Sequence, residues 1–477
     1  MAYVRGLDRS QPMLLPECLE DYVGEDNPVR VIDAFVDGLE LHEIGMDCKE
    51  EGSVGRDGYH PKALLKLFVY GYLHRIRSSR QLERSTKCNL EVIWLLGKLQ
   101  PDHWTINEFR RRHCGCFKAV LRNFNMLSLE LGLFGAELIA LDGTFIKAVN
   151  SKARNYTGAK LKKLIKRVDE LIAQYLKDLE DSVDPGGEQD DSGGQRQATA
   201  EALEALKERR HEYLRLVEEA QNSTTGQVSL SDPDSRRLSK GSQNTVGYNA
   251  QIAVDSKHHL IVAGEVTQDG NDQRQLEPMS QSAQDELGAQ QLKIVADGDY
   301  HNLSQIHRLE QRGMEVHSPP RAPRQSTQNY YPLSSFHHDG SRDHYVCPEG
   351  HHLTRHADAT EGEVIYRIYY NTKACRNCPV RGACTKASYR KLHIHEHAEA
   401  GKKVALRMTR CPEVYARRQG IVEHVFGTIK WDWDQGALMT RGLEGARGEW
   451  MLSCLAYNFR RVLSLVGSRR LLQAMRS

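Results

Sequence analysis

No part of the sequence approaches the roughly 18–20 uninterrupted apolar residues that a membrane-spanning helix requires. Its first residues, Met-Ala-Tyr-Val-Arg-Gly-Leu-Asp-Arg, contain no apolar core of the signal-peptide type. An excess of positive charge is also missing, because 65 Lys and Arg face 63 Asp and Glu and leave a formal net charge of +2. These absences argue against a membrane protein and predict a cytoplasmic one. They also exclude a uniformly basic surface, so any contact with a polyanion must come from local basic patches.

Two short apolar runs each lead into an aspartate. Asp142 follows Leu-Ile-Ala-Leu at 138–141, and Asp297 follows Leu-Lys-Ile-Val-Ala at 292–296. Runs of this length predict buried strands, with each aspartate at the strand end. An Asp-Gly pair after a strand is most often a turn, so neither aspartate by itself indicates a catalytic site.

A third carboxylate, that of Glu423, lies in a segment with helical spacing, where Val422, Phe426 and Ile429 recur at i, i+4 and i+7. Hard cations such as Mg²⁺ take oxygen ligands and keep room for water and substrate phosphates. A pair of such ions can activate a water or hydroxyl and stabilise the leaving oxygen in an in-line displacement at phosphorus. The three acids together therefore predict the metal-dependent chemistry of cutting and joining DNA strands.

The neighbours of Glu423 strengthen this prediction. Lys430 follows two helical turns later on the same face, and Tyr415 and Arg418 precede it. In these residues the sequence resembles the DDE transposases of bacterial insertion sequences, whose third acidic motif carries a Tyr-Arg-Glu-Lys signature. The interval from Arg to Glu is one residue longer than usual in that motif, so Arg417 stays an alternative to Arg418.

Two further motifs resemble the same family. Leu-Asp-Gly-Thr-Phe at 141–145 is similar to its first motif, and Gly-Tyr-Asn-Ala-Gln-Ile-Ala-Val-Asp at 247–255 is similar to the strand between the first two acids. The second motif usually has the form Ala-Asp-x-Gly-Tyr, whereas this chain has Ala-Asp-Gly-Asp-Tyr at 296–300. Asp299 is therefore an alternative to Asp297, which we favour because it directly follows the strand.

The resemblance implies a mechanism and its partners. Asp142, Asp297 and Glu423 would hold Mg²⁺ or Mn²⁺, a water would hydrolyse the element end, and the freed 3′-hydroxyl would attack target DNA. The implied partners are double-stranded DNA, as element ends and as target, and further copies of the chain in a homodimer or higher oligomer. The basic and aromatic residues expected to contact DNA around this site are Lys147, Arg154, Tyr415, Arg418 and Lys430, with a solvated surface as the alternative for Lys147 and Arg154.

Two other functions remain open at this point. The first is a nuclease on the same scaffold that cuts DNA without joining it. The second is a DNA-binding protein that descends from a transposase and has lost its activity. The presence of all three acids and of Lys430 argues against the second, and the displaced Gly298 is the single hint in its favour.

Residues 1–130 have the pattern of an all-α unit. An apolar stripe spans Val29 to Leu41, Pro61 opens a second helix in the position that suits proline, and Ser78 with Gln81 and Thr105 with Glu108 have the spacing of capping boxes. The resemblance implies that this unit binds DNA, and a helical bundle with a solvated basic face is the alternative. The arginines expected to meet phosphates or groove edges are Arg75, Arg77, Arg80, Arg84, Arg110, Arg111 and Arg112.

The rest of the chain predicts an α/β fold of the ribonuclease-H-like type, a mixed sheet with flanking helices. Residues 135–330 and 396–465 would form this catalytic domain, because three strands, a helix, a strand, a helix, a strand and a final helix follow in that order. Residues 159–222 would be a helical hairpin insertion. Its tip at 181–200 is rich in Gly, Asp, Gln and Ser and has too few apolar residues to fold.

A second insertion, 340–395, is rich in cysteine. Cys347, Cys375, Cys378 and Cys384 match a tetrahedral structural zinc site in ligand type and number, and this segment would be zinc-ribbon-like. His351 or His352 could replace one thiol, and reduced thiols or a redox pair are the alternatives. Such a zinc ion would stabilise the insertion and take no part in strand transfer.

Overall fold

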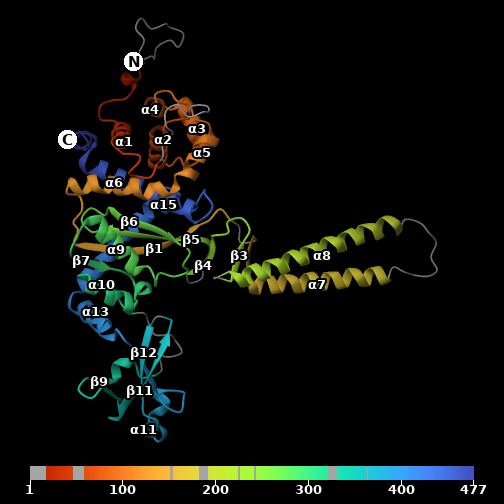
Figure 1. The fold of residues 1–477 in the computed structure, drawn as a ribbon, viewed down its shortest axis with the longest axis vertical. Helices are drawn as coiled ribbons and strands as arrows, with labels where there is room; N and C mark the ends of the chain where they lie inside the picture. Colours follow the sequence, from red (N-terminus) through yellow and green to blue (C-terminus); the bar gives the residue numbers. More distant parts are fainter. Residues whose placement is uncertain are drawn as a thin grey trace, which may run out of the picture.

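The computed structural model describes residues 18–46, 58–150, 154–181, 192–223, 226–240, 243–320, 330–362 and 364–476. A mixed sheet lies at the centre, helices from both ends of the chain cover it, a long helical hairpin projects to one side, and a small β unit lies at the far end (Figure 1). Within these residues no helix is both long and apolar enough to cross a membrane.

The N-terminal helices form where caps and proline favour them. Pro28 and Pro61 each lie in the first turn of a helix, after the capping residues Asn27 and His60. The two predicted capping boxes are absent: Ser78 makes no side-chain cap, and the N-cap of α5 is Asp102, which accepts from the Thr105 amide. The helices are α1 (Pro28–Asp37), α2 (Pro61–Leu73), α3 (Ser79–Cys88), α4 (Leu90–Leu95), α5 (His103–Arg112) and α6 (Phe117–Glu130).

The central sheet has six strands in the order β4-β5-β1-β7-β8, with β6 beside β5. The long strand β5 pairs with β1 along one edge and with β4 and β6 along the other, always antiparallel. The pairs β1–β7 and β7–β8 are parallel. The strands are β1 (Leu138–Lys147), β4 (Arg236–Lys240), β5 (Gln243–Asp255), β6 (Ile261–Thr267), β7 (Leu292–Val295) and β8 (Met314–His317), and the helices α9 (Leu276–Leu287) and α10 (Leu303–Gln311) follow β6 and β7.

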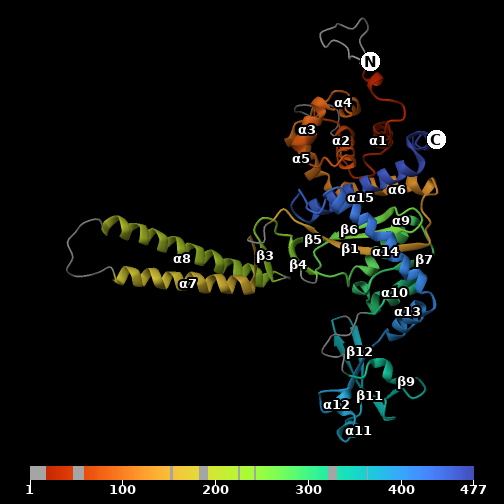
Figure 2. The same cartoon turned by 180° about the vertical axis from the view of Figure 1, so that it is seen from behind.

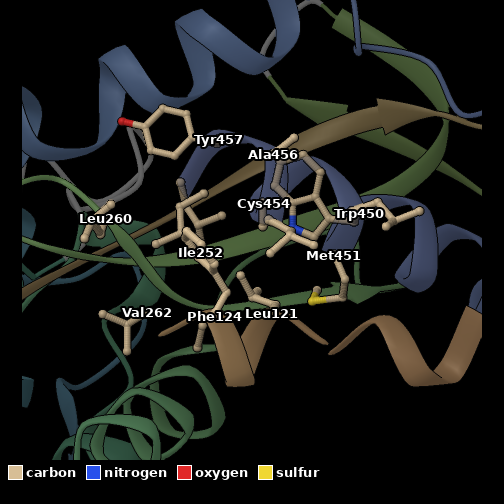
Figure 3. Close-up of a cluster of buried hydrophobic side chains, with 14 of the residues drawn as sticks. Leu121, Phe124, Ile252, Leu260, Val262, Trp450, Met451, Cys454, Ala456 and Tyr457 are labelled. Carbon is tan, nitrogen blue, oxygen red and sulfur yellow. The ribbon is translucent and has the colours of Figure 1, made fainter. Parts of the chain in front are cut away.

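The C-terminal helices return to this sheet. They are α13 (Ala398–Arg410), α14 (Pro412–Phe426), the π-helical segment η7 (Gly427–Asp432), α15 (Leu443–Val466) and α16 (Ser468–Ala474). Trp450, Met451 and Cys454 of α15 pack among Leu121 and Phe124 of α6 and the strands of the sheet, together with the other side chains shown in Figure 3. Because α15 lies between the sheet and the N-terminal helices, it joins the two ends of the chain (Figure 2).

One hydrophobic core therefore extends from the N-terminal helices to the C-terminus. Phe35 of α1, Phe124 of α6 and Phe459 of α15 illustrate this, with ring centroids 4.4–5.6 Å apart. Asn125 and Asn458 complete the contact, because their amides bond the backbone of the edge strand β6 at Ile261 and Val262. The expected boundary near residue 130 is thus not a break in the packing.

The first insertion is a helical hairpin, α7 (Gly158–Asp181) and α8 (Ser192–Asn222), that stands on the short antiparallel pair β2 (Asn155–Thr157) and β3 (Gln227–Ser229). Its small core at the base contains Leu161, Leu216 and Ala220. The expected unstructured tip at 181–200 is partly wrong, because α8 already begins at Ser192. Residues 182–191 lie outside the described part of the chain.

The second insertion is a five-stranded antiparallel sheet in the order β13-β12-β11-β10-β9. It consists of β9 (His337–Asp339), β10 (His344–Val346), β11 (His352–Glu361), β12 (Val364–Tyr370) and β13 (Lys391–His395), with two short helices, α11 (Thr372–Arg376) and α12 (Arg381–Cys384), between the last two strands. Six buried side chains form its separate core: Phe336, Tyr345, Leu353, Tyr369, Leu392 and Ile394.

Candidate functional site

Asp142 lies on β1 and not at its end, because the strand continues to Lys147 and Asp142 pairs with Ile252 of β5. The four residues before it are buried, while the Asp142 side chain keeps 17% of its surface exposed. Its Oδ1 accepts from the Gly143 amide at 2.9 Å. The expectation of a strand-end position was therefore wrong in detail, since the antiparallel partner β5 extends β1 beyond the apolar run.

Asp297 lies beside it by virtue of strand register. Parallel strands β1 and β7 pair Ala140 with Val295, and each aspartate is two residues further along its own chain segment. Neighbouring strands are about 4.8 Å apart, so this register puts the two aspartates on adjacent chain segments, with Asp297 just past the end of β7. Asp297 also caps the short helix η4 (Gly298–Tyr300), where its Oδ1 accepts from the Asp299 amide at 2.9 Å.

The Tyr300 phenol is buried, and the charges of both carboxylates act on it. Burial and then the charges of Asp272, Asp142 and Asp297 raise the pKa of Tyr300 well above its usual value, while Arg418 opposes them. Asp299 is half-buried. Tyr300 thus faces the two aspartates that the sequence identified and a third that it did not.

That third aspartate, Asp272, belongs to a buried polar network. Its Oδ1 accepts from the Asn249 and Gln251 side-chain amides at 2.7 Å each. The side-chain oxygen of Gln251, Oε1, accepts from the Tyr300 hydroxyl. Asn249 and Gln251 are fully buried and occupy alternate positions in the buried stretch of β5 from Tyr248 to Val254. This i, i+2 polar pair was a signal that could have been noticed in the sequence, whereas Asp272 carried none.

Arg418 supplies a positive charge to the site from α14. Its guanidinium Nη1 lies 3.4 Å from Asp142 Oδ2, and both side chains are more than four-fifths covered. Lys430, at the other end of this helical segment, donates to Thr144 Oγ1 at 2.8 Å and to the Phe145 carbonyl at 3.2 Å. The two cations therefore lie along the same stretch of β1, at residues 142–145.

Glu423 lies between Arg418 and Lys430 on the helix but is exposed, and its Oε1 accepts from Gln419 Nε2 at 2.7 Å. In the part of the chain that the structure describes, no three or more His, Cys, Asp or Glu side chains are arranged to hold a metal ion. The structure thus brings Asp142 and Asp297 together and leaves Glu423 on the neighbouring helix, facing solvent. The expected convergence of all three acids is not seen in this arrangement.

The remaining residues predicted around the site differ in exposure. Tyr415 is half-buried on α14, while Arg417, Lys147 and Arg154 are exposed. The Lys147 backbone joins the segment after η7, because its amide donates to the Gly436 carbonyl and its carbonyl accepts from Leu438. These contacts connect the end of β1 to the chain that follows Lys430.

Three of the N-terminal arginines contact other parts of the chain, and of these Arg75 is exposed. Arg110 is 5% exposed and donates to the Arg77 carbonyl and to Asn107. Arg77 pairs with the buried Glu449 at 3.1 Å, and Arg75 pairs with Asp432 at 3.0 Å, so both tie the N-terminal helices to the C-terminal part of the chain. The other exposed arginines are Arg80 and Arg84 on α3 and Arg111 and Arg112 on α5, of which the last two pair with Glu108.

The four cysteines of the second insertion line one cavity of about 30 Å³, together with His351. Burial raises the pKa of the Cys384 thiol; Arg390 lowers it, and the thiols of Cys375, Cys347 and Cys378 raise it further. All four thiols are free and half-buried. The structure thus gathers the four predicted ligands, although their sulfur atoms are not at the separations of a formed metal site.

Comparison with known proteins gives two family matches. The family described as "Transposase domain (DUF772)" matches residues 17–112, and the family described as "Transposase DDE domain" matches residues 346–463, which include Glu423 and Lys430. The second match does not extend to Asp142 or Asp297. No curated protein matches the chain.

One solved structure is similar, "Cryo-EM structure of piggyBac transposase synaptic complex with hairpin DNA (SNHP)". It is 9% identical, covers 94% of this chain and 79% of its own, and has a TM-score of 0.32. A likeness this weak supports no argument about this chain. The two family matches confirm the resemblance found in the sequence: residues 17–112 match a transposase domain family, and residues 346–463 match a transposase DDE domain family.

Proposed function

We propose that this transposase cleaves DNA at the ends of its element and joins those ends to target DNA, in a reaction that depends on Mg²⁺ or Mn²⁺. The observation that carries the proposal is the register of β1 and β7, in which Asp142 and Asp297 each lie two residues beyond the paired Ala140 and Val295. The strand order supports a ribonuclease-H-like arrangement, since three antiparallel strands, β1, β5 and β6, are followed by β7 and β8 in parallel on the other side of β1.

The donor set fits a hard divalent cation. Carboxylate oxygens are the ligands that Mg²⁺ prefers, and Asp142 already meets a cation in the form of the Arg418 guanidinium group. Asp142 and Asp297 would hold the metal, and Glu423 would complete the set once its side chain leaves Gln419 and turns towards β1. When bound, such ions supply an activated water or hydroxyl and stabilise the leaving oxygen at phosphorus.

The other residues around the site position the DNA and the acids. Arg418 would exchange its contact with Asp142 for a phosphate near the scissile bond, because a guanidinium group binds phosphate through two parallel hydrogen bonds. Lys430 would hold a phosphate from its position beside Thr144, and the half-buried Tyr415 would stack on a base or bond a phosphate. Lys147 and Arg154 would contact DNA from the rim of the same groove.

The test of the carboxylates uses labelled DNA that contains the element end. We expect Asp142→Asn, Asp297→Asn and Glu423→Gln to abolish both cleavage and joining in Mg²⁺ while gel-shift affinity for the same DNA is kept. Asp299→Asn is the matched control and should remain active. Cleavage by Glu423→Gln would show that Glu423 is not a catalytic acid. An inactive Asp299→Asn together with an active Asp297→Asn would show that Asp299, and not Asp297, is the second acid.

The DNA contact of the N-terminal helices belongs to the exposed arginines in this proposal. Arg80 and Arg84 are one helical turn apart on α3, so they present two guanidinium groups on one face. Each phosphate contact contributes about −0.9 to the slope of log K against log salt on duplex DNA. We therefore expect the pair of changes Arg80→Ala and Arg84→Ala to reduce that slope by about two, and an unchanged slope would remove α3 from the DNA contact.

The two alternative functions are tested by the same DNA. A nuclease without strand transfer would cut the element end but fail to join pre-cut ends to a target plasmid. A DNA-binding protein without activity would do neither in Mg²⁺ or Mn²⁺. Assembly of two ends implies at least a dimer of the chain, which sedimentation of the protein with pre-cut ends would measure.

A further inference from the structure

The turns that carry the four cysteines are built by backbone hydrogen bonds. Cys347 lies in the turn between β10 and β11, where its amide donates to the His351 carbonyl and its carbonyl accepts from Gly350, at 2.9 Å each. Gly350 has a φ of +76°, which favours glycine. This turn fixes the backbone of Cys347 independently of its thiol.

The other three cysteines lie in the segment between β12 and β13 that contains two short helices. Cys375 is in α11 and Cys384 ends α12, and Cys378 lies between them, with its amide donating to the Cys375 carbonyl and its carbonyl accepting from Arg381. Arg390 donates to the Cys384 carbonyl at 2.9 Å and to the Tyr331 carbonyl at 3.3 Å, which connects this segment to β13 and to the start of the unit. Two separate chain segments thus bring their cysteines to one cavity.

The cavity has the size and the charge for one ion. About 30 Å³ exceeds the roughly 10–15 Å³ that a single water needs and leaves no room for a larger ligand. Four thiolates around a divalent cation carry a net charge of −2, and the guanidinium groups of Arg381 and Arg390 line the same cavity and offset it. His351 lines it as well, whereas His352 begins β11 and does not.

The unit around the cavity has little hydrophobic core of its own. Six buried side chains form the core of residues 330–395, and Cys347 and Cys384 pack at the edge of that core. Small units with so few buried side chains generally need a disulfide or a metal to hold them together. These cysteines form no disulfide, so their thiols are available as ligands for a metal that would stabilise the unit.

We propose that Cys347, Cys375, Cys378 and Cys384 bind one structural Zn²⁺ ion that stabilises the unit formed by residues 330–395. In the bound state the four sulfur atoms would lie at tetrahedral ligand positions, about 2.3 Å from the ion. This site is separate from the carboxylates on β1, β7 and α14, and its zinc takes no part in the chemistry at phosphorus.

The first test measures metal in the full-length protein purified without added zinc. We expect about one zinc ion per chain by elemental mass spectrometry, and Co²⁺ exchanged for it should give the thiolate-to-metal charge-transfer band of a tetrahedral site. Cys378→Ser and Cys347→Ser should lower the zinc content to background. Cys88→Ser, which removes an exposed thiol on α3, is the matched control and should leave the content unchanged.

A second measurement covers the outcome in which a cysteine variant fails to fold. Chelation of zinc from the wild-type chain should expose residues 330–395 to limited proteolysis and make four more thiols reactive, while the central sheet stays protected. Zinc-free protein with four reactive thiols and a protease-resistant unit would overturn the proposal, and so would a Cys375–Cys378 disulfide in the purified chain. If Cys384→Ser kept its full zinc content and His351→Ala lost its zinc, the fourth ligand would be the His351 imidazole and not the Cys384 thiol. This result would contradict the proposal of four cysteine ligands.

Discussion

Gly143 lies on β1 directly after Asp142 and faces the buried amides of β5. A Cβ atom at this position would be 2.2 Å from Gln251 Nε2 and 2.8 Å from Asp272 Oδ1, so a side chain cannot be accommodated without displacing the network. That network fixes Tyr300, which in turn faces both catalytic candidates, Asp142 and Asp297. A glycine that first looked like half of a turn is therefore a packing requirement of the site.

We expect Gly143→Ala to lower the cleavage rate at least about tenfold, which corresponds to about 1.4 kcal/mol in the barrier. The overpacked core should also lower the free energy of unfolding by about 1–3 kcal/mol. Gly420→Ala is the matched control, because a Cβ there on α14 meets no atom within 4 Å. Wild-type cleavage by Gly143→Ala would show that the network does not position the acids.

Glu108 on α5 offers a pH-dependent contribution to stability. Its hydrogen bonds to Arg111 and then to Arg112 lower the pKa of its carboxyl from 4.5 to about 2. A depressed folded-state pKa contributes stability above the unfolded pKa, and this contribution disappears as the pH falls from about 4.5 towards 2. We expect the stability difference between wild type and Glu108→Gln, measured by urea unfolding, to be largest near pH 6 and to shrink by pH 3. A difference independent of pH would contradict this assignment.

Helix α15 is the element that holds the N-terminal helices to the sheet. Its Glu449 is 1% exposed and accepts from Arg77, from the Met439 and Thr440 amides and from the Thr440 hydroxyl. Arg77 also donates to the carbonyls of Asp434 and Ala437, so it connects the chain after α2 to the segment before α15. Two arginines only three residues apart therefore differ in role: Arg77 forms contacts within the protein, whereas Arg80 is exposed.

Replacing Arg77 by Met should therefore destabilise the protein by about 3 kcal/mol, because removing one partner of a buried ion pair leaves the other charge uncompensated. Arg80→Met is the control and should change the free energy of unfolding by less than about 0.5 kcal/mol. Chemical unfolding followed by circular dichroism measures both. Equal stability of the two variants would mean that Glu449 is satisfied by its other donors alone.

At the scale of the whole molecule, the helical hairpin α7–α8 projects from the sheet and keeps its own small core (Figure 1). The strands at its base, β2 and β3, pair antiparallel with Thr157 opposite Gln227, so their ends are close enough for a two-residue turn. Replacement of residues 158–226 by Asn-Gly should leave the melting temperature of the remaining chain within a few degrees of the wild type. A collapse of the central sheet in this variant would show that the hairpin supports it.

The sequence predicted the helices and strands better than the tertiary contacts between them. Strands around Asp142 and Asp297, the hairpin insertion and the final helices follow from apolar periodicity, which is a local property. The capping box predicted at Thr105 is wrong because Asp102, three residues earlier, caps the helix, and Ser78 is the N-cap of α3 without a side-chain cap. The burial of Arg110 and the pairing of Arg77 were invisible, since their partners are brought close by folding alone.

The local sequence was sufficient to recognise the family resemblance, to propose the three acids and to single out the cluster of cysteines, because residue type and spacing encode these features directly. Only the assembled fold decided that Asp142 and Asp297 are neighbours, that Asp272, Gln251 and Tyr300 lie against them, and that Glu423 faces solvent beside Arg418 and Lys430. The physical reason is strand register and helix rotation, which are set by packing between segments more than a hundred residues apart in the chain.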